Sequence, residues 1–537
     1  MFSSNRYIIP LFLLFTIGLT SSLKSQNKYW VFFKDKNGST FNPYEYFDQK
    51  AIDRRIQNGI SLYDSTDFPL NQKYVDIVKN LSDSVSHSTR WFNGMAVYAN
   101  ISQISLIGEL PFVESIEPIN LVVRPANCEL DYDTTFSVNQ EEVLRKQTER
   151  MGLKVFEDNK IDGKGIRIAI FDGGFPSVDK NPAFEHIRKE NRIIKTWDFA
   201  KNNEFVYSYM NHGTMVMSCI GGIINNKKIG MATGAEFLLA RTEIKREPYS
   251  EEENWLAAVE WADKNGANII NSSLGYTYHR YFPHEMNGKI SLVARAGNLA
   301  AKKGILVVNA AGNDGDNSWK VVGTPGDADS VLTVGGIDPE TDYHVGFSSF
   351  GPTTDKRMKP NVCSFGIVTA VNPNGITTTQ GTSFSSPLVA GFAACAWQTK
   401  HDLKNMELFK EIEKSGDLYP YFDYAHGFGV PQASYFFKKE EVIESMKPEI
   451  PKSNQPFELI ASEMVLKVII NKEFMPDSAS KTPVHLFYNI EGSNGVLEKY
   501  FVISVNQQDV LEFILTDYKK GEKLNIHYLN YTTTYEF

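Results

Sequence analysis

Cysteine is scarce in this sequence. Only four occur among 537 residues, at Cys128, Cys219, Cys363 and Cys395, and none forms a C-x-x-C pair. That spacing gives little support to a zinc or redox site. Cys219 and Cys395 lie in apolar helical patterns, where a buried free thiol and a disulfide bridge both stay open.

An excess of basic residues is also absent. The 55 Lys and Arg stand against 64 Asp and Glu, which gives a formal net charge of -9. We therefore expect no nucleic-acid partner, because such partners bind a basic face. No compact acidic loop has the spacing of a calcium site, so structural calcium is left open and no metal ligand is assigned.

Long apolar runs are missing except at the start of the chain. Tyr7 to Leu19 is a run of thirteen residues, preceded by Arg6 and followed by small polar residues. A membrane-spanning helix needs about 20 residues, whereas the charged, apolar, small-residue order is typical of a secretory signal peptide. We predict a signal peptide over residues 1–25, no transmembrane segment after its removal, and a secreted, periplasmic or cell-surface protein.

The region after the signal alternates between strand and helix patterns. Five segments predict strand, helix, strand, helix and strand, in the order 28–34, 74–81, 91–99, 101–111 and 112–119. This predicts a small α+β module over 26–126. The polar, acidic stretch 127–144 is a candidate linker and processing region, because exposed linkers are where chains are cut.

From 145 to 440 the pattern becomes one of near-continuous apolar runs bounded by glycine. These runs are GIRIAIFDG, AEFLLAR, GANIINSSLG, KGILVVNAAGN and DSVLTVGG. Strands buried on both faces of a mostly parallel sheet have this pattern, with helices on both sides. From 450 to 537 strand-like runs are separated by turn residues without helical periodicity, which predicts a small all-β domain.

Three polar residues stand where strands lead into helices. Asp172 ends an apolar strand, His212 begins an apolar helix, and Ser383 precedes another helix whose start Pro387 places close by. Each alone has an ordinary structural explanation as a turn former or helix cap. Together they supply a carboxylate, an imidazole and a hydroxyl in the chain order Asp, His, Ser, which is the order of subtilisin.

The surrounding motifs carry a resemblance to a known family. FDGGF, NHGT and GTSFSSPLVAG resemble the three active-site signatures of the subtilisin-like serine proteases, the subtilases of peptidase family S8. MATGAEFLLAR, NSSLG, VVNAAGN, FSSFGP, KPNV and GFGVPQA resemble further landmarks in the same order. The resemblance covers roughly 145–440 and implies a subtilisin-like three-layer α/β domain with a mostly parallel sheet.

The resemblance extends to the module before that domain. WFNGMAVYA followed by LPFVESIEPI is similar to the end of a subtilase propeptide, which acts as an intramolecular inhibitor. Residues 41–73 look like an insertion beyond that simple pattern. The implied protein is a secreted serine endopeptidase made as a zymogen, with protein or peptide substrates and no cofactor required for catalysis.

The resemblance also implies a role for individual residues. Asp172, His212 and Ser383 are the expected catalytic residues, with an acyl-enzyme on Ser383, and Asn313 is the expected oxyanion donor. The expected substrate-binding residues are Ser273, Leu274 and Gly275 on one wall of the cleft and Ala310, Ala311 and Gly312 in the pocket. Three glycines are expected to serve the same geometry: Gly213 and Gly381 leave room for the backbone to approach substrate closely, and Gly312 lets the chain turn so that Asn313 points into the site.

Several positions depart from the family pattern. Gly173 stands where the family has Ser or Thr, Leu388 and Met215 where histidines are common, and Asn361 and Phe365 where Asp and Pro are usual. None removes a group from the mechanism, so they indicate a divergent member.

Two alternative functions are weighed. A catalytically silent binding module on the same fold, a pseudoprotease, is disfavoured by the complete residue set. An esterase of the α/β-hydrolase class is disfavoured because no G-x-S-x-G occurs and the residue order is wrong.

Overall fold

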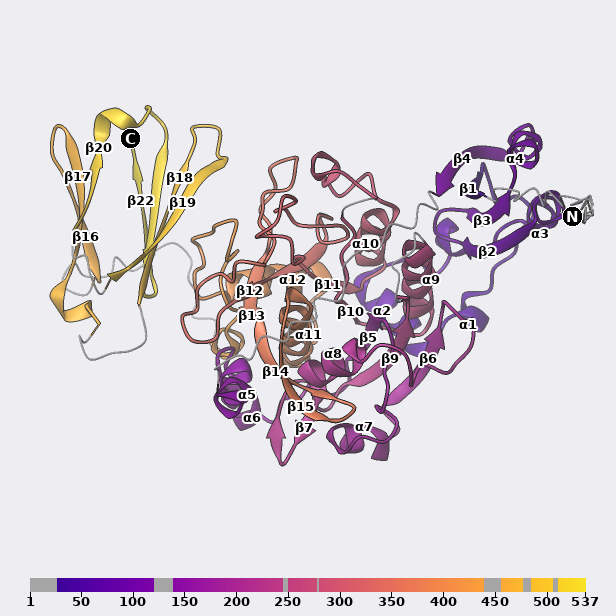
Figure 1. The fold of residues 1–537 in the computed structure, drawn as a ribbon, viewed down its shortest axis with the longest axis horizontal. Helices are drawn as coiled ribbons and strands as arrows, with labels where there is room; N and C mark the ends of the chain where they lie inside the picture. The colour runs from indigo at the N-terminus through magenta and orange to yellow at the C-terminus, as the bar shows by residue number, and fades with distance from the viewer. Residues whose placement is uncertain are drawn as a thin grey trace, which may run out of the picture.

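Three parts of the chain follow one another along the long axis of the molecule (Figure 1). The computed structural model describes residues 27–119, 139–244, 250–277, 280–438, 455–476, 484–505 and 510–537. We call 27–119 the N-terminal module, 139–438 the central domain and 455–537 the C-terminal β module. The predicted signal peptide, Cys128 and most of the predicted linker lie outside the described residues.

A seven-stranded sheet forms the middle of the central domain. Its strands are β5 (Arg167–Asp172), β6 (Ile193–Asp198), β9 (Glu236–Arg241), β10 (Ile269–Ser272), β11 (Leu306–Ala310), β12 (Val331–Ile337) and β13 (Val362–Phe365). They lie in the order β13-β12-β11-β10-β5-β9-β6, and every pair is parallel. The predicted α/β class with a parallel sheet is confirmed.

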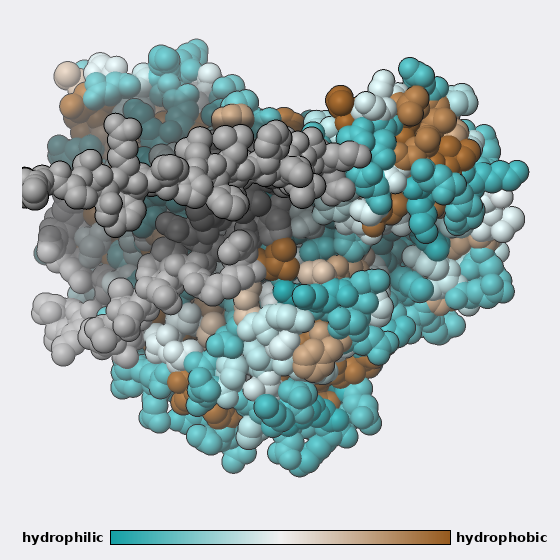
Figure 2. Space-filling view, turned by 45° about the vertical axis from the view of Figure 1, so that its right-hand side comes forward, coloured by the Kyte–Doolittle hydropathy of each residue, from teal (hydrophilic) through white to brown (hydrophobic). Residues whose placement is uncertain are grey.

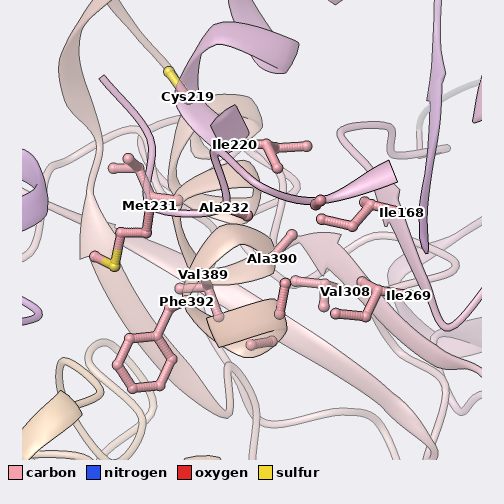
Figure 3. Packing of buried hydrophobic residues seen from close by; sticks show 14 of the residues in the cluster. Ile168, Cys219, Ile220, Met231, Ala232, Ile269, Val308, Val389, Ala390 and Phe392 are labelled. Carbon is pink, nitrogen blue, oxygen red and sulfur yellow. The ribbon is translucent and has the colours of Figure 1, made fainter. Parts of the chain in front are cut away.

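The two faces of this sheet carry separate hydrophobic cores because side chains alternate along each strand. Ile168 and Ile170 of β5 face one core, whereas Ala169 and Phe171 face the other. The first core is covered by α8 (His212–Gly221), α11 (Thr382–Thr399) and α12 (Asn405–Lys414), the second by α9 (Ser250–Lys264) and α10 (Leu292–Lys302). Figure 3 shows the first core, where Ala390 of α11 lies between Ile220 of α8 and the sheet residue Val308.

Shorter elements complete the central domain. They are α5 (Gln140–Glu149), α6 (Leu153–Asp158), α7 (Glu185–Lys189), β7 (Ile223–Ile224), β8 (Lys227–Lys228) and the hairpin of β14 (Ile367–Asn372) and β15 (Gly375–Gln380). The predicted linker 127–144 overlaps the first residues of α5.

Cys219, Cys363 and Cys395 are buried free thiols. Burial raises the pKa of the Cys219 thiol to about 12, so it is unreactive near neutral pH.

The N-terminal module is an antiparallel sheet with helices. Its elements are β1 (Asn27–Phe33), α1 (Pro43–Tyr46), α2 (Gln49–Asn58), α3 (Gln72–Leu81), β2 (Ser84–Thr89), β3 (Gly94–Ala99), α4 (Ile101–Gly108) and β4 (Val113–Ile119), with sheet order β2-β3-β1-β4. Val31 faces the module's own core under α3 and α4, whereas Trp30 and Phe32 join the core formed with α9 and α10. The sheet therefore lies on the central domain.

The C-terminal β module consists of two antiparallel sheets around one core. Its strands are β16 (Phe457–Ala461), β17 (Val465–Ile470), β18 (His485–Glu491), β19 (Leu497–Ser504), β20 (Val510–Ile514), β21 (Lys523–Tyr528) and β22 (Tyr531–Glu536). The orders are β16-β17-β20 and β19-β18-β21-β22, so the predicted all-β region is present.

On the face drawn in Figure 2, hydrophilic residues dominate and hydrophobic ones form separate patches. No helix in the described ranges is long and apolar enough to cross a membrane.

Candidate active site

The predicted functional residues converge on the carboxyl edge of the central sheet. Asp172 is the last residue of β5, Ser273 directly follows β10, and Ala310 ends β11. The carboxyl ends of parallel strands share one edge, and ligands of open α/β sheets bind there. Helix α8 begins at this edge with His212.

Asp172, which is buried, forms a hydrogen-bonded pair with His212, which is partly exposed. The Nδ1 atom of His212 lies 2.9 Å from Oδ2 and 3.1 Å from Oδ1 of Asp172, and the aspartate is 0% exposed. An ionised carboxylate can only accept hydrogen bonds, so Nδ1 carries the proton and Nε2 is left as the basic nitrogen. The backbone N–H of Gly173 donates a further hydrogen bond of 2.7 Å to Oδ1.

The pair changes the basicity of the imidazole. Burial lowers the pKa of His212, but the negative charge of Asp172 and its hydrogen bond outweigh that effect, so the net pKa is raised above the ordinary 6.5. The protonated form of His212 is therefore stabilised. A general base, which takes up a proton during the reaction, requires this stabilisation.

Gly213 allows helix α8 to approach strand β5, and Gly173 lies against the segment that precedes α8. A Cβ atom on Gly213 would lie 2.3 Å from the carbonyl oxygen of Gly174 and 3.0 Å from Cβ of Asp172. The atoms for which Gly213 makes room belong to the turn after β5, and its expected part in the approach to substrate stays a prediction. A Cβ on Gly173 would lie 2.6 Å from Sδ of Met210, so a Ser or Thr at this position would have to displace the Met210 side chain.

Ser383 is the second residue of α11 rather than its cap. The N-cap is Gly381, with φ of +134°, and the helix continues through Pro387. From 381 to 397 every residue is buried except Ser383, which is half-buried. A hydroxyl that reaches the surface from the first turn of a buried helix lies beside free backbone N–H groups and the positive end of the helix dipole.

Ser273 makes a reciprocal contact with Ser383. Because Pro387 has no N–H, the Ser383 carbonyl lacks its helical donor, and Oγ of Ser273 donates to it at 2.9 Å. Oγ of Ser383 in turn donates to the Ser273 carbonyl at 3.1 Å. No hydrogen bond in the described ranges joins Ser383 to His212, whose ring centroid lies 5.3 Å from that of the neighbouring Phe384.

Asn313 is held in one orientation. Its Oδ1 accepts hydrogen bonds from the backbone N–H of Thr382 at 2.8 Å and from Oγ1 of Thr382 at 2.9 Å. With the amide oxygen fixed, the Nδ2 donor faces the start of α11, 3.4 Å from where a Cβ on Gly381 would lie. Gly312 has the positive φ of +108° expected of the turn before Asn313.

The six predicted substrate-binding residues differ in exposure. Ser273, Leu274, Ala310 and Ala311 are buried, with exposures of 0–6%. Gly275 is exposed with open space at its Cβ position, and Gly312 is half-buried. A ligand at this edge would therefore meet mainly backbone atoms.

Three supporting residues were not predicted. Arg241, at the end of β9, donates from Nε to the Gly173 carbonyl at 3.1 Å and pairs with Asp198 at 2.9 Å. Thr382 orients Asn313. Asn271 accepts from Ser386 of α11 through Oδ1 and donates to Ser273 through Nδ2. A polar residue at the end of an apolar strand, as in AEFLLAR, is the only sequence signal for Arg241.

The residues that depart from the family pattern lie in the core. Leu388, Met215 and Phe365 belong to or pack against the first core. Asn361 is buried, donates to Glu413 at 2.8 Å and accepts from Lys359 at 3.0 Å. Among the described residues, none of these four has a hydrogen bond or ion pair with Asp172 or His212, whereas Gly173, the fifth departure, donates its backbone N–H to Asp172. Within the described ranges, no group of three His, Cys, Asp or Glu is placed to hold a metal ion.

Models of known protein families match both the central domain and the N-terminal module. The model of the subtilase family, Peptidase S8, matches residues 163–429, and that of the Peptidase S8 propeptide domain of Bacteroidota matches 28–131. The chain belongs to the subtilase family. The propeptide match includes 41–73, so these residues lie within the Bacteroidota propeptide domain.

Individual subtilases show the same relationship. The chain is 31% identical over 255 residues to the thermophilic serine proteinase of Bacillus sp. (strain AK1), covering 47% of this chain and 57% of that one. It is 27% identical over 293 residues to the serine protease AprX of Bacillus subtilis (strain 168), covering 48% and 62%. It is 28% identical over 250 residues to subtilisin DY of Bacillus licheniformis, covering 46% and 84%. The chain therefore spans less than two thirds of the length of two of these relatives.

The His212 pKa can be measured without any assay of activity. In histidine-labelled Ser383→Ala protein followed by NMR, we expect the His212 imidazole to titrate above pH 6.5. In the same spectra His344 and His527, whose pKa burial lowers to about 4, should stay neutral across that range. Adding Asp172→Asn removes the charge that raises the pKa, so the His212 titration should move to lower pH. Titration at or below 6.5 with Asp172 intact would contradict the described pair.

Proposed function

We propose that this subtilase is a serine endopeptidase that cleaves peptide bonds through an acyl-enzyme on Ser383. The observation that carries the proposal is the hydrogen bond of partly exposed His212 to buried Asp172, at the same sheet edge as the half-buried Ser383 at the start of a buried helix. The family membership supports the same chemistry. Asp172, His212 and Ser383 are the proposed catalytic residues, and Asn313 is the proposed oxyanion donor.

The chemistry follows from the geometry at His212. The Ser383 hydroxyl turns from the Ser273 carbonyl toward Nε2 of His212, which takes its proton as the Oγ–C bond forms. Asp172 stabilises the resulting imidazolium without itself taking the proton. His212 then protonates the leaving amine as the C–N bond breaks, and a water repeats the sequence to release the acid.

The oxyanion is stabilised by donors at the start of α11. Nδ2 of Asn313 and the backbone N–H of Ser383 supply two hydrogen bonds at the positive end of the helix. Thr382 holds the Asn313 amide before substrate arrives, so the donor needs no reorganisation during the reaction. The exposed backbone of Gly275 provides an edge along which an extended peptide can pair.

We propose that the N-terminal module acts as an inhibitor removed on maturation, in an exported zymogen. Support comes from the propeptide match over 28–131 and from the burial of Trp30 and Phe32 against α9 and α10. The sequence pattern of residues 1–25 supports export.

Removal of the nucleophile tests this function. Purified Ser383→Ala protein should hydrolyse no peptide and should stay uncut in the region 120–145, whereas the unaltered chain should be processed there. The measurement is intact-mass spectrometry of protein from a host lacking extracellular proteases. A Thr399→Ala variant, altered at the far end of the same helix, serves as the control for processing. Normal processing of Ser383→Ala would exclude self-maturation.

The oxyanion donor has a separate signature in steady-state kinetics. Asn313→Ala should lower kcat by about 10²–10³-fold with little change in KM, because the donor acts on charge that develops after binding. Thr382→Val should lower kcat by a smaller factor, since the amide remains but its orientation is less restricted. An effect of Asn313→Ala on KM alone would contradict the oxyanion role.

A further inference from the structure

Helix α2 of the N-terminal module lies at the amino-terminal edge of the central sheet, the edge opposite the candidate active site. Asp48, which caps α2, pairs with Arg167 at the start of β5 at 3.1 Å, and Lys50 pairs with Glu236 at the start of β9 at 3.2 Å. In Figure 1, α2 lies beside β5 and β10, away from the four-stranded sheet of its own module.

The turns that precede β10 and β11 are shaped to this helix. A Cβ atom on Gly266 would lie 2.8 Å from Cβ of Lys50, and one on Gly304 would lie 3.0 Å from Nδ2 of Asn58. Both glycines have positive φ, +74° and +86°. Any side chain at either glycine would therefore meet α2 directly.

Two consecutive arginines of α2 are fully buried against the amino-terminal edge of the central sheet. Arg54 is 2% exposed and donates to the carboxylate of Asp263, to the Ala267 carbonyl and, at 3.2 Å, to the Lys303 carbonyl. Arg55 is 0% exposed and lies 2.6 Å from Oδ2 of Asp263. The planar guanidinium fork suits such divided contacts, which a lysine could not reproduce.

A third charge of the module completes the network. Asp67 lies 2.8 Å from Arg55 and 2.9 Å from Nζ of Lys303, which also donates to Thr66 at 2.6 Å. Asp67, Asp263 and Lys303 are each 1% exposed. Buried charges are stable only when paired, so each member depends on the others.

The side chains on the central-domain side have partners only in the N-terminal module. Among the described residues, the ion pairs and side-chain hydrogen bonds of Asp263 are with Arg54 and Arg55, and those of Lys303 are with Asp64, Thr66 and Asp67. Nothing else in the described central domain pairs with these two charges. They are therefore a binding site for this module rather than a support for the central domain.

The module has a separate contact on α9. Glu260 accepts hydrogen bonds from the backbone N–H groups of Arg90, at 3.0 Å, and Trp91, at 3.2 Å, and from Oγ1 of Thr89. The module therefore contacts the central domain at two places, Glu260 and the buried ion-pair network. When one contact is formed, the other forms within the same complex, so the two together slow release of the module more than either alone.

We propose that Arg54, Arg55, Asp67, Asp263 and Lys303, the amino-edge anchor, hold the N-terminal module on the central domain after the chain is cut. The cut belongs to the proposed maturation, whereas the binding itself rests only on the contacts described above.

The test separates binding from activity. A site-specific protease sequence replaces residues within 127–137 of the full Ser383→Ala chain, so an added protease makes the cut. The rate at which the N-terminal fragment leaves is followed by size-exclusion chromatography after dilution. The fragment should stay bound in the parent, and Arg54→Met with Arg55→Met should raise its release rate by about 10²–10³-fold. Asp53→Asn, an exposed position on the same helix, should release at the parent rate.

A central-domain variant keeps the test decisive if the arginine variant does not fold. Lys303→Met removes a side chain whose charged partners lie in the module, so the central domain should keep its circular dichroism spectrum while the fragment leaves faster. Combined with Asp67→Leu, the effect should be less than the product of the single effects, because both variants break the same pair. Parent-like release from Lys303→Met would overturn the anchor, even if the Ser383 enzyme proved inactive.

Discussion

Burial of the Asp172 carboxylate is the constraint on which the candidate site depends. A carboxylate with no exposed surface must be compensated by hydrogen bonds, here from the Gly173 N–H and His212. Those bonds require the start of α8 to lie against the turn after β5, which in turn requires glycine at position 213. The raised pKa of His212 and the position of its basic nitrogen both follow from this packing.

The two edges of the central sheet carry polar groups with different roles. At its carboxyl edge a few polar groups stay accessible, notably Ser383 and the backbone of Gly275. At its amino edge five charges are buried together, three from the N-terminal module and two from the central domain. A helix at the far edge can therefore hold the module on the central domain without contact to the residues at the carboxyl edge.

The sequence predicted the structure correctly where a local pattern is compatible with only one kind of element or site. Glycine-bounded apolar runs predicted the parallel strands, and the order Asp172, His212, Ser383 predicted residues that gather at one sheet edge. It was uninformative where the outcome depended on packing between distant segments. Nothing in Arg54 or Arg55 indicated burial, because arginines on a short polar helix are usually exposed. The contact of Gly213 with Gly174 was not predicted for the same reason: the two residues are close only in the folded chain.

The most direct measurement of the central claim is labelling of the matured protein with a fluorophosphonate, followed by mass spectrometry of the peptide bearing residue 383. A serine activated by the Asp172–His212 pair should give a single adduct on Ser383, formed more slowly as the pH falls below the raised pKa of His212. The Ser383→Ala protein should give none. Matured, folded protein that remains unlabelled at Ser383 would contradict the account and indicate a binding module on a subtilase fold.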